Sequence, residues 1–148
     1  MKPEVDQILS ISAGQLLATA VPLLPNNYAQ GSTSVLAFMM FFCAQEYERG
    51  AEIRACENAE MRELFGELSA NVTDRELKEK ITTAALSADS SLLISALDKS
   101  NADLRKLLIA LQVHFEERGD AEARACEKRI WKVLKASAER RFLKPPGA

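Results

Sequence analysis

The heptapeptide at residues 51–57 reads Ala51-Glu-Ile-Arg-Ala-Cys-Glu57, and it returns 70 residues later as Ala121-Glu-Ala-Arg-Ala-Cys-Glu127. Six of the seven positions are identical, and each copy follows a Glu-Arg-Gly that itself follows an apolar run. Repetition of this kind is typical of similar helical units packed about a shared core. We therefore predict a pseudo-duplicated helical unit. The alternative is chance, since Ala, Glu and Arg are common in any helical chain.

The composition predicts an all-α protein. Ala, Leu, Glu, Lys and Arg dominate the 148 residues, whereas the helix breakers are few, with six Gly and five Pro. A chain of this length is the size of one domain with a single core. We predict one helical domain over residues 1–148, an antiparallel bundle of five or six helices, with residues 144–148 as a flexible tail.

The order of apolar residues and breakers predicts the helix boundaries. We expect helices at residues 4–21, 32–68, 73–86, about 91–118 and 121–143. The patterns leave open whether Gly50 divides the long second helix. The expected caps are Asn26 or Asn27, Thr73 in a capping box with Glu76, Asp89 or Ser90, and Asp120 after a terminating Gly119.

The net charge of −2 conceals a basic C-terminal part. Residues 120–148 carry eight Lys and Arg against four Asp and Glu. One hypothesis is nucleic-acid binding through Arg124, Lys128, Lys132 and Lys135, since clustered cations attract phosphate. We favour the alternative that these cations complement the helix dipole and face solvent. Nucleic acid is therefore not an expected partner.

The cysteines and the N-terminus indicate a cytoplasmic protein. Cys43, Cys56 and Cys126 are odd in number and form no Cys-x-x-Cys motif, and the first residues lack the basic region of a secretory signal. The longest apolar stretch, Val35 to Ala44, has ten residues, about half of a membrane span. We expect no membrane span. Because the repeat places a cysteine in each copy, a redox pair of Cys56 and Cys126 is a further hypothesis.

No motif for chemistry is found. A carboxylate-bridged metal site in a bundle needs two Glu-x-x-His pairs, but His114 is the only histidine and Leu111 stands three residues before it. Glycine-rich phosphate loops and nucleophile elbows are lacking, since the glycines stand singly. We predict no catalytic residues, no metal ligands and no cofactor, and His114 as a surface or hydrogen-bonded core residue.

Aromatic and methionine side chains gather at Phe38-Met-Met-Phe-Phe42. One interpretation is the wall of an apolar ligand pocket, with Phe38, Met39, Phe42 and Tyr47 as binding residues. The other is an ordinary core or a subunit interface, because a helix that is apolar on most sides must bury that surface. A single small bundle has few neighbours to cover it, which favours a homodimer.

These observations predict a non-catalytic cytoplasmic helical interaction or accessory protein, homodimeric, and open to a protein partner. The alternative is a helical protein, or an enzyme subunit, that binds a small apolar ligand near residues 38–47.

Overall fold

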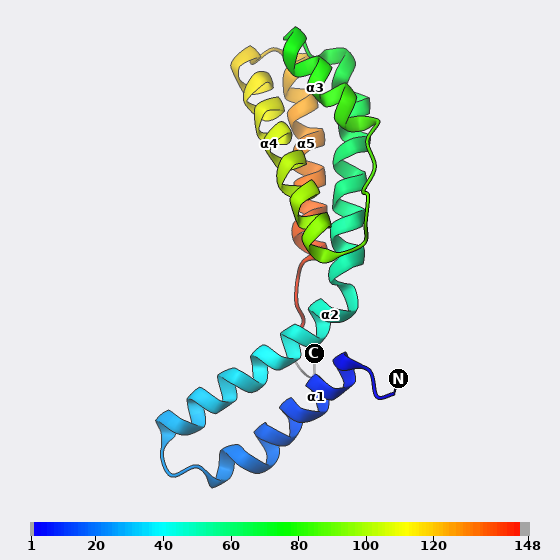
Figure 1. Cartoon of the computed structure of the whole chain (residues 1–148). Helices are drawn as coiled ribbons and strands as arrows, with labels where there is room; N and C mark the ends of the chain where they lie inside the picture. Colours follow the sequence, from blue (N-terminus) through cyan, green and yellow to red (C-terminus); the bar gives the residue numbers. More distant parts are fainter. Residues whose placement is uncertain (1, 146–148) are drawn as a thin grey trace. The chain divides into compact units, whose positions relative to one another are not determined.

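The computed structural model describes residues 2–145, and its regular elements are all helices. The five α-helices are α1 (Val5–Gln15), α2 (Asn27–Leu68), α3 (Arg75–Ala85), α4 (Ile94–Arg118) and α5 (Ala121–Arg140). Short helical turns cover Leu16–Ala20, Val21–Leu23 and Ser69–Asn71. The predicted all-α fold is confirmed (Figure 1).

The chain divides into two compact units, which we call the hairpin unit and the bundle unit. The hairpin unit holds residues 1–50 and 142–148, and the bundle unit holds residues 51–141. Helix α2 contributes to both units, so the division does not separate two independent chains of elements. The prediction of one domain over residues 1–148 stays a prediction. Residues 146–148 of the predicted tail lie outside the described residues, whereas Lys144 exchanges two backbone hydrogen bonds with the side chain of Gln45.

In the hairpin unit, α1 and the first part of α2 lie side by side (Figure 1). The predicted first helix is confirmed, since α1 continues through its two short turns to Leu23. Three small side chains are buried in this unit, namely Ala13, Ala37 and Ala44. Asn26 caps α2 by accepting a hydrogen bond of 2.9 Å from the Ala29 N–H. Helix α2 therefore begins at Asn27, earlier than the Gly-Ser-rich residues 31–34 indicated.

The bundle unit has one hydrophobic core between α2, α4 and α5, with α3 packed against α4. The largest fully buried apolar side chains are Phe65, Phe115, Ile81, Leu97, Leu111 and Ile130. Helix α5 runs antiparallel to α4 after the tight turn at residues 119–120, whereas α4 runs in the same direction as α2 (Figure 1). Residues 86–93, between α3 and α4, run back along the bundle, and this return allows α4 to run in the same direction as α2 (Figure 1).

Two of the predicted helix boundaries are wrong at their caps. Helix α3 is capped by Asp74, whose carboxylate accepts a hydrogen bond of 2.6 Å from the Leu77 N–H, and not by Thr73. Helix α4 begins at Ile94 without a side-chain cap, because Asp89 is instead paired with Arg62. The turn at 119–120 is as predicted: Gly119 has φ of 63°, and Asp120 accepts from the Ala123 N–H at 2.8 Å.

Gly50 does not divide its helix. It is helical within α2, and the boundary between the two units falls directly after it. The two copies of the heptapeptide consequently have different surroundings, one in the middle of α2 and one at the start of α5. Cys56 is half-buried where Cys126 is buried, and Glu57 is buried where Glu127 is half-buried. Duplication stays a prediction.

The position of the α3 cap can be tested by substitution. We expect Asp74→Ala to lower the free energy of unfolding by about 1 kcal/mol, because it removes the acceptor of an otherwise unpaired helix N–H. The matched variant Thr73→Ala should cost less than about 0.5 kcal/mol. Urea unfolding followed by circular dichroism measures both, and a larger loss for Thr73→Ala would return the cap to Thr73.

Candidate functional site

The four predicted binding residues lie on α2 in the hairpin unit, where they remain largely open to solvent. The exposed fraction is 41% for Phe38, 55% for Met39 and 54% for Tyr47, and Phe42 is half-buried. These side chains do not line the groove between α2 and α5 that is described below. Whether they bind an apolar ligand stays a prediction, but their exposure makes them a candidate interaction surface.

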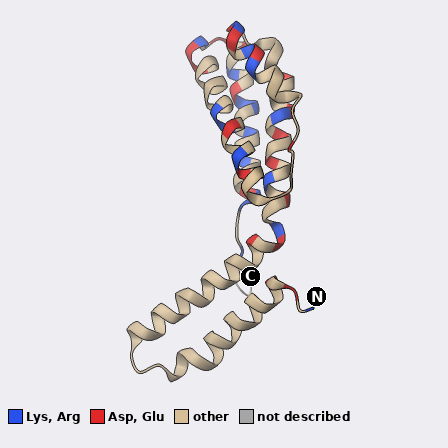
Figure 2. Ribbon diagram, viewed as in Figure 1, with Lys and Arg blue, Asp and Glu red and all other residues tan. Residues whose placement is uncertain are grey.

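The sequence around this surface contains no charge. Residues 7–45 include no Asp, Glu, Lys, Arg or His, a run of 39 residues. In Figure 2 the ribbon of residues 7–45 is tan for this reason, whereas blue and red recur along the helices of the bundle unit. The hairpin thus offers exposed apolar side chains without the charges that normally keep a helix surface in water.

Helical spacing places the apolar side chains of α2 on its outward face. Val35, Phe38, Met39 and Phe42 have the spacing i, i+3, i+4, i+7, which puts them on one face of the helix. The buried Ala37 and Ala44 lie on the opposite face, and Ala13 of α1 is also buried. Met40 and Phe41, which lie toward the same side of α2 as the two alanines, are half-buried, whereas Val35, Phe38 and Met39 are exposed. We call Val35, Phe38, Met39 and Phe42 the α2 stripe.

A second candidate site is a buried polar network in the bundle unit, centred on the Glu57 carboxylate. The side chain of Glu57 is 2% exposed. Arg141 donates two hydrogen bonds to it, each of 2.6 Å, and the Ser137 hydroxyl donates a third of 2.7 Å. Asn101 donates at 3.2 Å, and Arg105 lies 3.5 Å away. The carboxylate thus joins α2, α4 and the end of α5.

The network continues through Asn58 to the return segment. Asn58 accepts a hydrogen bond of 2.9 Å from Asn101 and donates one of 3.1 Å to Asp89. Arg62 donates two hydrogen bonds, of 2.7 and 3.2 Å, to the same Asp89 carboxylate. Arg62 also donates to the hydroxyls of Ser87 and Ser100. Among the described residues, no buried side-chain nitrogen or oxygen is left without a hydrogen-bond partner.

The charges of this network fix the ionised form of its two carboxylates. Burial by itself raises the pKa of Glu57, but hydrogen bonds from Arg141 and Ser137 and the charges of Arg141 and Arg105 lower it to about 2. Hydrogen bonding from Arg62 lowers the pKa of Asp89 against the opposing effect of burial. Both groups therefore stay charged at neutral pH and have no proton to donate as a general acid.

Acid should remove the contribution of Glu57 to stability. Because its folded-state pKa lies below the ordinary value of 4.5, the contribution is complete above that pH and is lost as the pH falls toward 2. We expect Glu57→Gln to lower the free energy of unfolding at pH 7 by about 3 kcal/mol, since it leaves Arg141 without its buried counter-charge.

Urea titrations at pH 7, 4 and 3 test this expectation. The difference between the wild type and Glu57→Gln should shrink as the pH falls. The control Glu79→Gln removes an exposed carboxylate paired with Arg75 and should cost less than about 0.5 kcal/mol at each pH. A Glu57→Gln loss that does not change with pH would contradict the assigned pKa.

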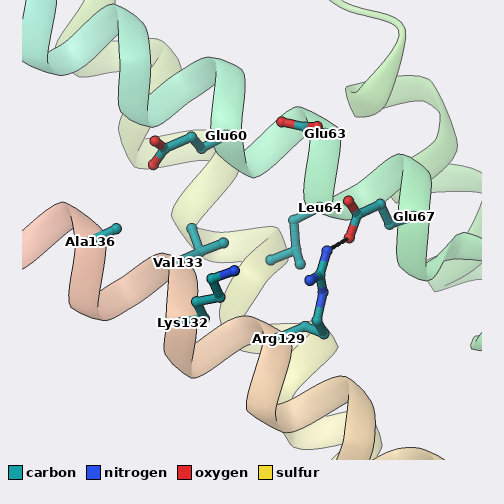
Figure 3. A pocket seen from close by; sticks show the side chains of 8 residues that line it. All are labelled: Glu60, Glu63, Leu64, Glu67, Arg129, Lys132, Val133 and Ala136. Carbon is teal, nitrogen blue, oxygen red and sulfur yellow. Dashed lines mark hydrogen bonds and ion pairs between the residues drawn. The ribbon is translucent and has the colours of Figure 1, made fainter.

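An open groove between α2 and α5 has a volume of about 260 Å³ (Figure 3). Leu64, Val133 and Ala136 form its apolar part, and Glu60, Glu63, Glu67, Arg129 and Lys132 supply charged walls. Ion pairs of Glu67 with Arg129 and of Glu60 with Arg140 join the two helices along it. Because carboxylates face cations across the groove, its walls neutralise one another and concentrate neither sign of charge.

The remaining sequence candidates have structural roles or stay untested. His114 is half-buried, and its Nε2 lies 3.3 Å from the Thr73 N–H, as a hydrogen-bonded histidine should. Of the four basic residues, Arg124 donates to the Gly119 carbonyl at the start of its own helix, and Lys135 lies 3.8 Å from Glu139. Lys132 borders the α2–α5 groove, and Lys128 is exposed.

The three cysteines are free and differ in exposure. Cys43 is exposed, Cys56 is half-buried and Cys126 is buried in the bundle core. Burial raises the pKa of the Cys126 thiol, which disfavours the reactive thiolate. The hypothesis of a redox pair between Cys56 and Cys126 stays a prediction.

Thiol labelling can rank these positions. In the native protein we expect Cys43 to react first with an aromatic disulfide reagent and Cys126 to react only on unfolding, because Cys126 is buried and protonated. Cys43→Ser should remove the fast phase and Cys126→Ser the slowest one. Rapid reaction of Cys126 would contradict its burial. Oxidation that removes two thiols in the wild type but none in Cys56→Ser would support the redox pair.

Within residues 2–145, no group of three His, Cys, Asp or Glu side chains is placed to hold a metal ion. No helix in the same residues has both the length and the apolar character needed to cross a membrane. Comparisons of the chain with protein-family models, curated proteins and solved structures gave no match.

Sequence reasoning missed the polar network, although a signal for it is present. Asn101 occupies a position in the apolar stripe of α4 that also carries Leu97, Leu104 and Leu108. Glu57 and Asn58 interrupt the buried positions of α2 in the same way, between Ile53 and Met61. A polar residue at a core position of an amphipathic helix indicates a buried partner.

Proposed function

We propose that this chain is a non-catalytic helical interaction protein that works as a homodimer, with the hairpin unit as its interface. The observation that carries the proposal is the uncharged run of residues 7–45 together with the exposed apolar side chains that it displays. As part of the proposal we place the protein in the cytoplasm, where its three free cysteines would stay reduced.

The amount of exposed apolar surface supports an interface. Ten large apolar side chains between residues 5 and 47 are at least 41% exposed, namely Val5, Ile8, Ile11, Leu23, Tyr28, Val35, Leu36, Phe38, Met39 and Tyr47. Four of them, Tyr28, Val35, Phe38 and Met39, have the spacing of one face of α2, whereas the others lie on α1, in the turn after it or on other faces of α2.

The chemistry of the surface favours a second copy over a charged partner or a lipid surface. A charged partner would lose hydration of its charges against residues 7–45 and gain no counter-charge. Lipid would meet exposed amides and hydroxyls, among them Gln7, Gln15 and Ser32, whose hydrogen bonds hydrocarbon cannot replace. A second hairpin is equally uncharged and offers both apolar and hydrogen-bonding groups.

The proposal predicts that one charge in the stripe dissociates the dimer. Met39→Lys should raise the dimer dissociation constant by at least about 100-fold, because an unpaired ammonium would be buried. The control Ile109→Lys changes a side chain of similar exposure, 63%, on α4 of the bundle unit and should leave the dimer intact. Sedimentation equilibrium at micromolar concentration measures both variants.

Native mass spectrometry of the wild type reports the subunit count and any small molecule retained with it. A wild-type monomer that does not bind vesicles would overturn the homodimer. A monomer that floats with vesicles of neutral phospholipid would assign the hairpin to lipid instead. A monomer that carries a stoichiometric apolar compound would favour the ligand-binding alternative.

A further inference from the structure

We infer that one face of α5 is a docking surface for an acidic helix of a partner protein. This face, which we call the Trp131 face, consists of Arg124, Lys128, Trp131 and Lys135. It lies wholly within the bundle unit, so it is separate from the hairpin and does not depend on the proposed homodimer. It gives the proposed interaction protein a second surface, whose chemistry differs from that of the first.

Helical spacing places a tryptophan between cations on this face. Its four residues have the spacing i, i+4, i+7, i+11, so they follow one another along one side of α5 over about 16 Å. Trp131 is the only tryptophan of the chain and is 58% exposed. The three cations are exposed as well. The face therefore offers a large aromatic ring and positive charges to the same partner.

The bundle leaves most of the Trp131 side chain uncovered. Helix α5 packs into the bundle with another face, whose buried residues are Ala123, Cys126, Ile130 and Ser137. A tryptophan buries 150–250 Å² when it is covered, and tryptophan is enriched among the few residues that carry most of the binding energy of an interface. Trp131 is thus available as the apolar anchor of a partner.

The residues around Trp131 select an acidic partner. Of the four residues one turn away from it, Lys128 and Lys135 are exposed, whereas Glu127 and Leu134 are half-buried. Lys128 forms no ion pair with any of the described residues. A helix with carboxylates one turn to either side of an apolar residue would set those carboxylates against the two lysines and its apolar residue against the indole. Charge complementarity of this kind decides partner choice.

The neighbouring groups favour an acidic helix over a nucleic acid. Nucleic-acid binding strengthens with the number of phosphates that are neutralised, so it needs many free cations. Arg124 already donates two hydrogen bonds to the Gly119 carbonyl. Lys132, at the edge of the Trp131 face, borders the α2–α5 groove, whose α2 wall carries three carboxylates. A run of phosphates would meet those carboxylates, whereas a helix needs only two carboxylates of its own.

Tryptophan fluorescence tests the Trp131 face directly, because the chain has no other tryptophan. The full-length protein is titrated at low ionic strength with an amphipathic helical peptide of Leu, Ala and Glu, and with the same peptide carrying Gln in place of Glu. We expect the acidic peptide to shift the emission to shorter wavelength until it saturates, and the neutral peptide to leave it unchanged. Added salt should weaken the binding, since it screens the lysine charges.

Substitutions separate the charges from the anchor, with anisotropy of the labelled acidic peptide as the measurement. Lys128→Glu combined with Lys135→Glu should weaken binding at least about 10-fold, because it sets like charges against each other. Trp131→Ala should also weaken it at least about 10-fold. The control Lys78→Glu combined with Lys99→Glu makes the same change of charge at exposed lysines of α3 and α4 and should bind like the wild type. Circular dichroism checks that each variant is folded.

Each other outcome overturns the inference. An acidic peptide that leaves the emission unchanged, or that binds the Lys128→Glu, Lys135→Glu variant as tightly as the wild type, would remove the docking surface. An oligothymidylate that shifts the emission where the acidic peptide does not would assign the face to nucleic acid. A wild-type species larger than a dimer, lost in the same double variant, would assign it to a second copy. Sedimentation of the wild type tests the proposed homodimer independently of these results.

Discussion

The carboxylate of Glu57 lies where α2, α4 and the end of α5 meet, surrounded by Arg141, Ser137, Asn101 and Arg105. A charge in that position is costly unless each of its oxygens is paired, and here both are. The pairing works only in one register of the three helices, since a shift by one residue would leave a buried charge without its partner. The apolar core by itself favours one helix register over its neighbours less strongly, because Leu and Ile side chains tolerate small displacements.

The same network explains how a parallel helix pair is held in a small bundle. Because α2 and α4 run in the same direction, the chain must return along the bundle through residues 86–93. That segment has no helix of its own, and it is fastened by Asp89 to Arg62 and Asn58 and by Ser87 to Arg62. The exposed Leu86, Leu92 and Leu93 show that polar bonds rather than apolar burial anchor it.

The hairpin unit, in contrast to the bundle unit, has no buried polar network among its described residues and exposes apolar side chains. Its buried side chains are Ala13, Ala37 and Ala44, and large apolar side chains such as Val35 and Met39 are exposed within a run of 39 residues without a charge. A unit of two short helices cannot bury both sides of such a helix, so this surface remains available to a further helix. The bundle unit carries the charged surface and the polar network, and the hairpin unit carries the surface that we propose for assembly.

Local signals in the sequence were reliable where one residue decides the geometry. Gly119 and Asp120 were predicted to end α4 and cap α5, because a left-handed backbone and a capping carboxylate are local requirements. The prediction of Thr73 as the cap of α3 was wrong, since the neighbouring Asp74 can also cap a helix and does so here. The prediction of Asp89 as the cap of α4 was wrong for another reason. Its carboxylate accepts hydrogen bonds from Arg62, which lies 27 positions away in the sequence.

The amino-acid sequence by itself determined that this protein is helical, where most of its helices begin and end, and that residues 38–42 carry an unusual apolar surface. These properties depend on propensity, spacing and neighbours within a few turns. Only the tertiary structure decided that Glu57 and Asn101 are core residues, that the two heptapeptides have different surroundings, and that the α2 stripe faces outward. The physical reason is that burial depends on which helices pack together. Two helices of identical local sequence can therefore bury different residues.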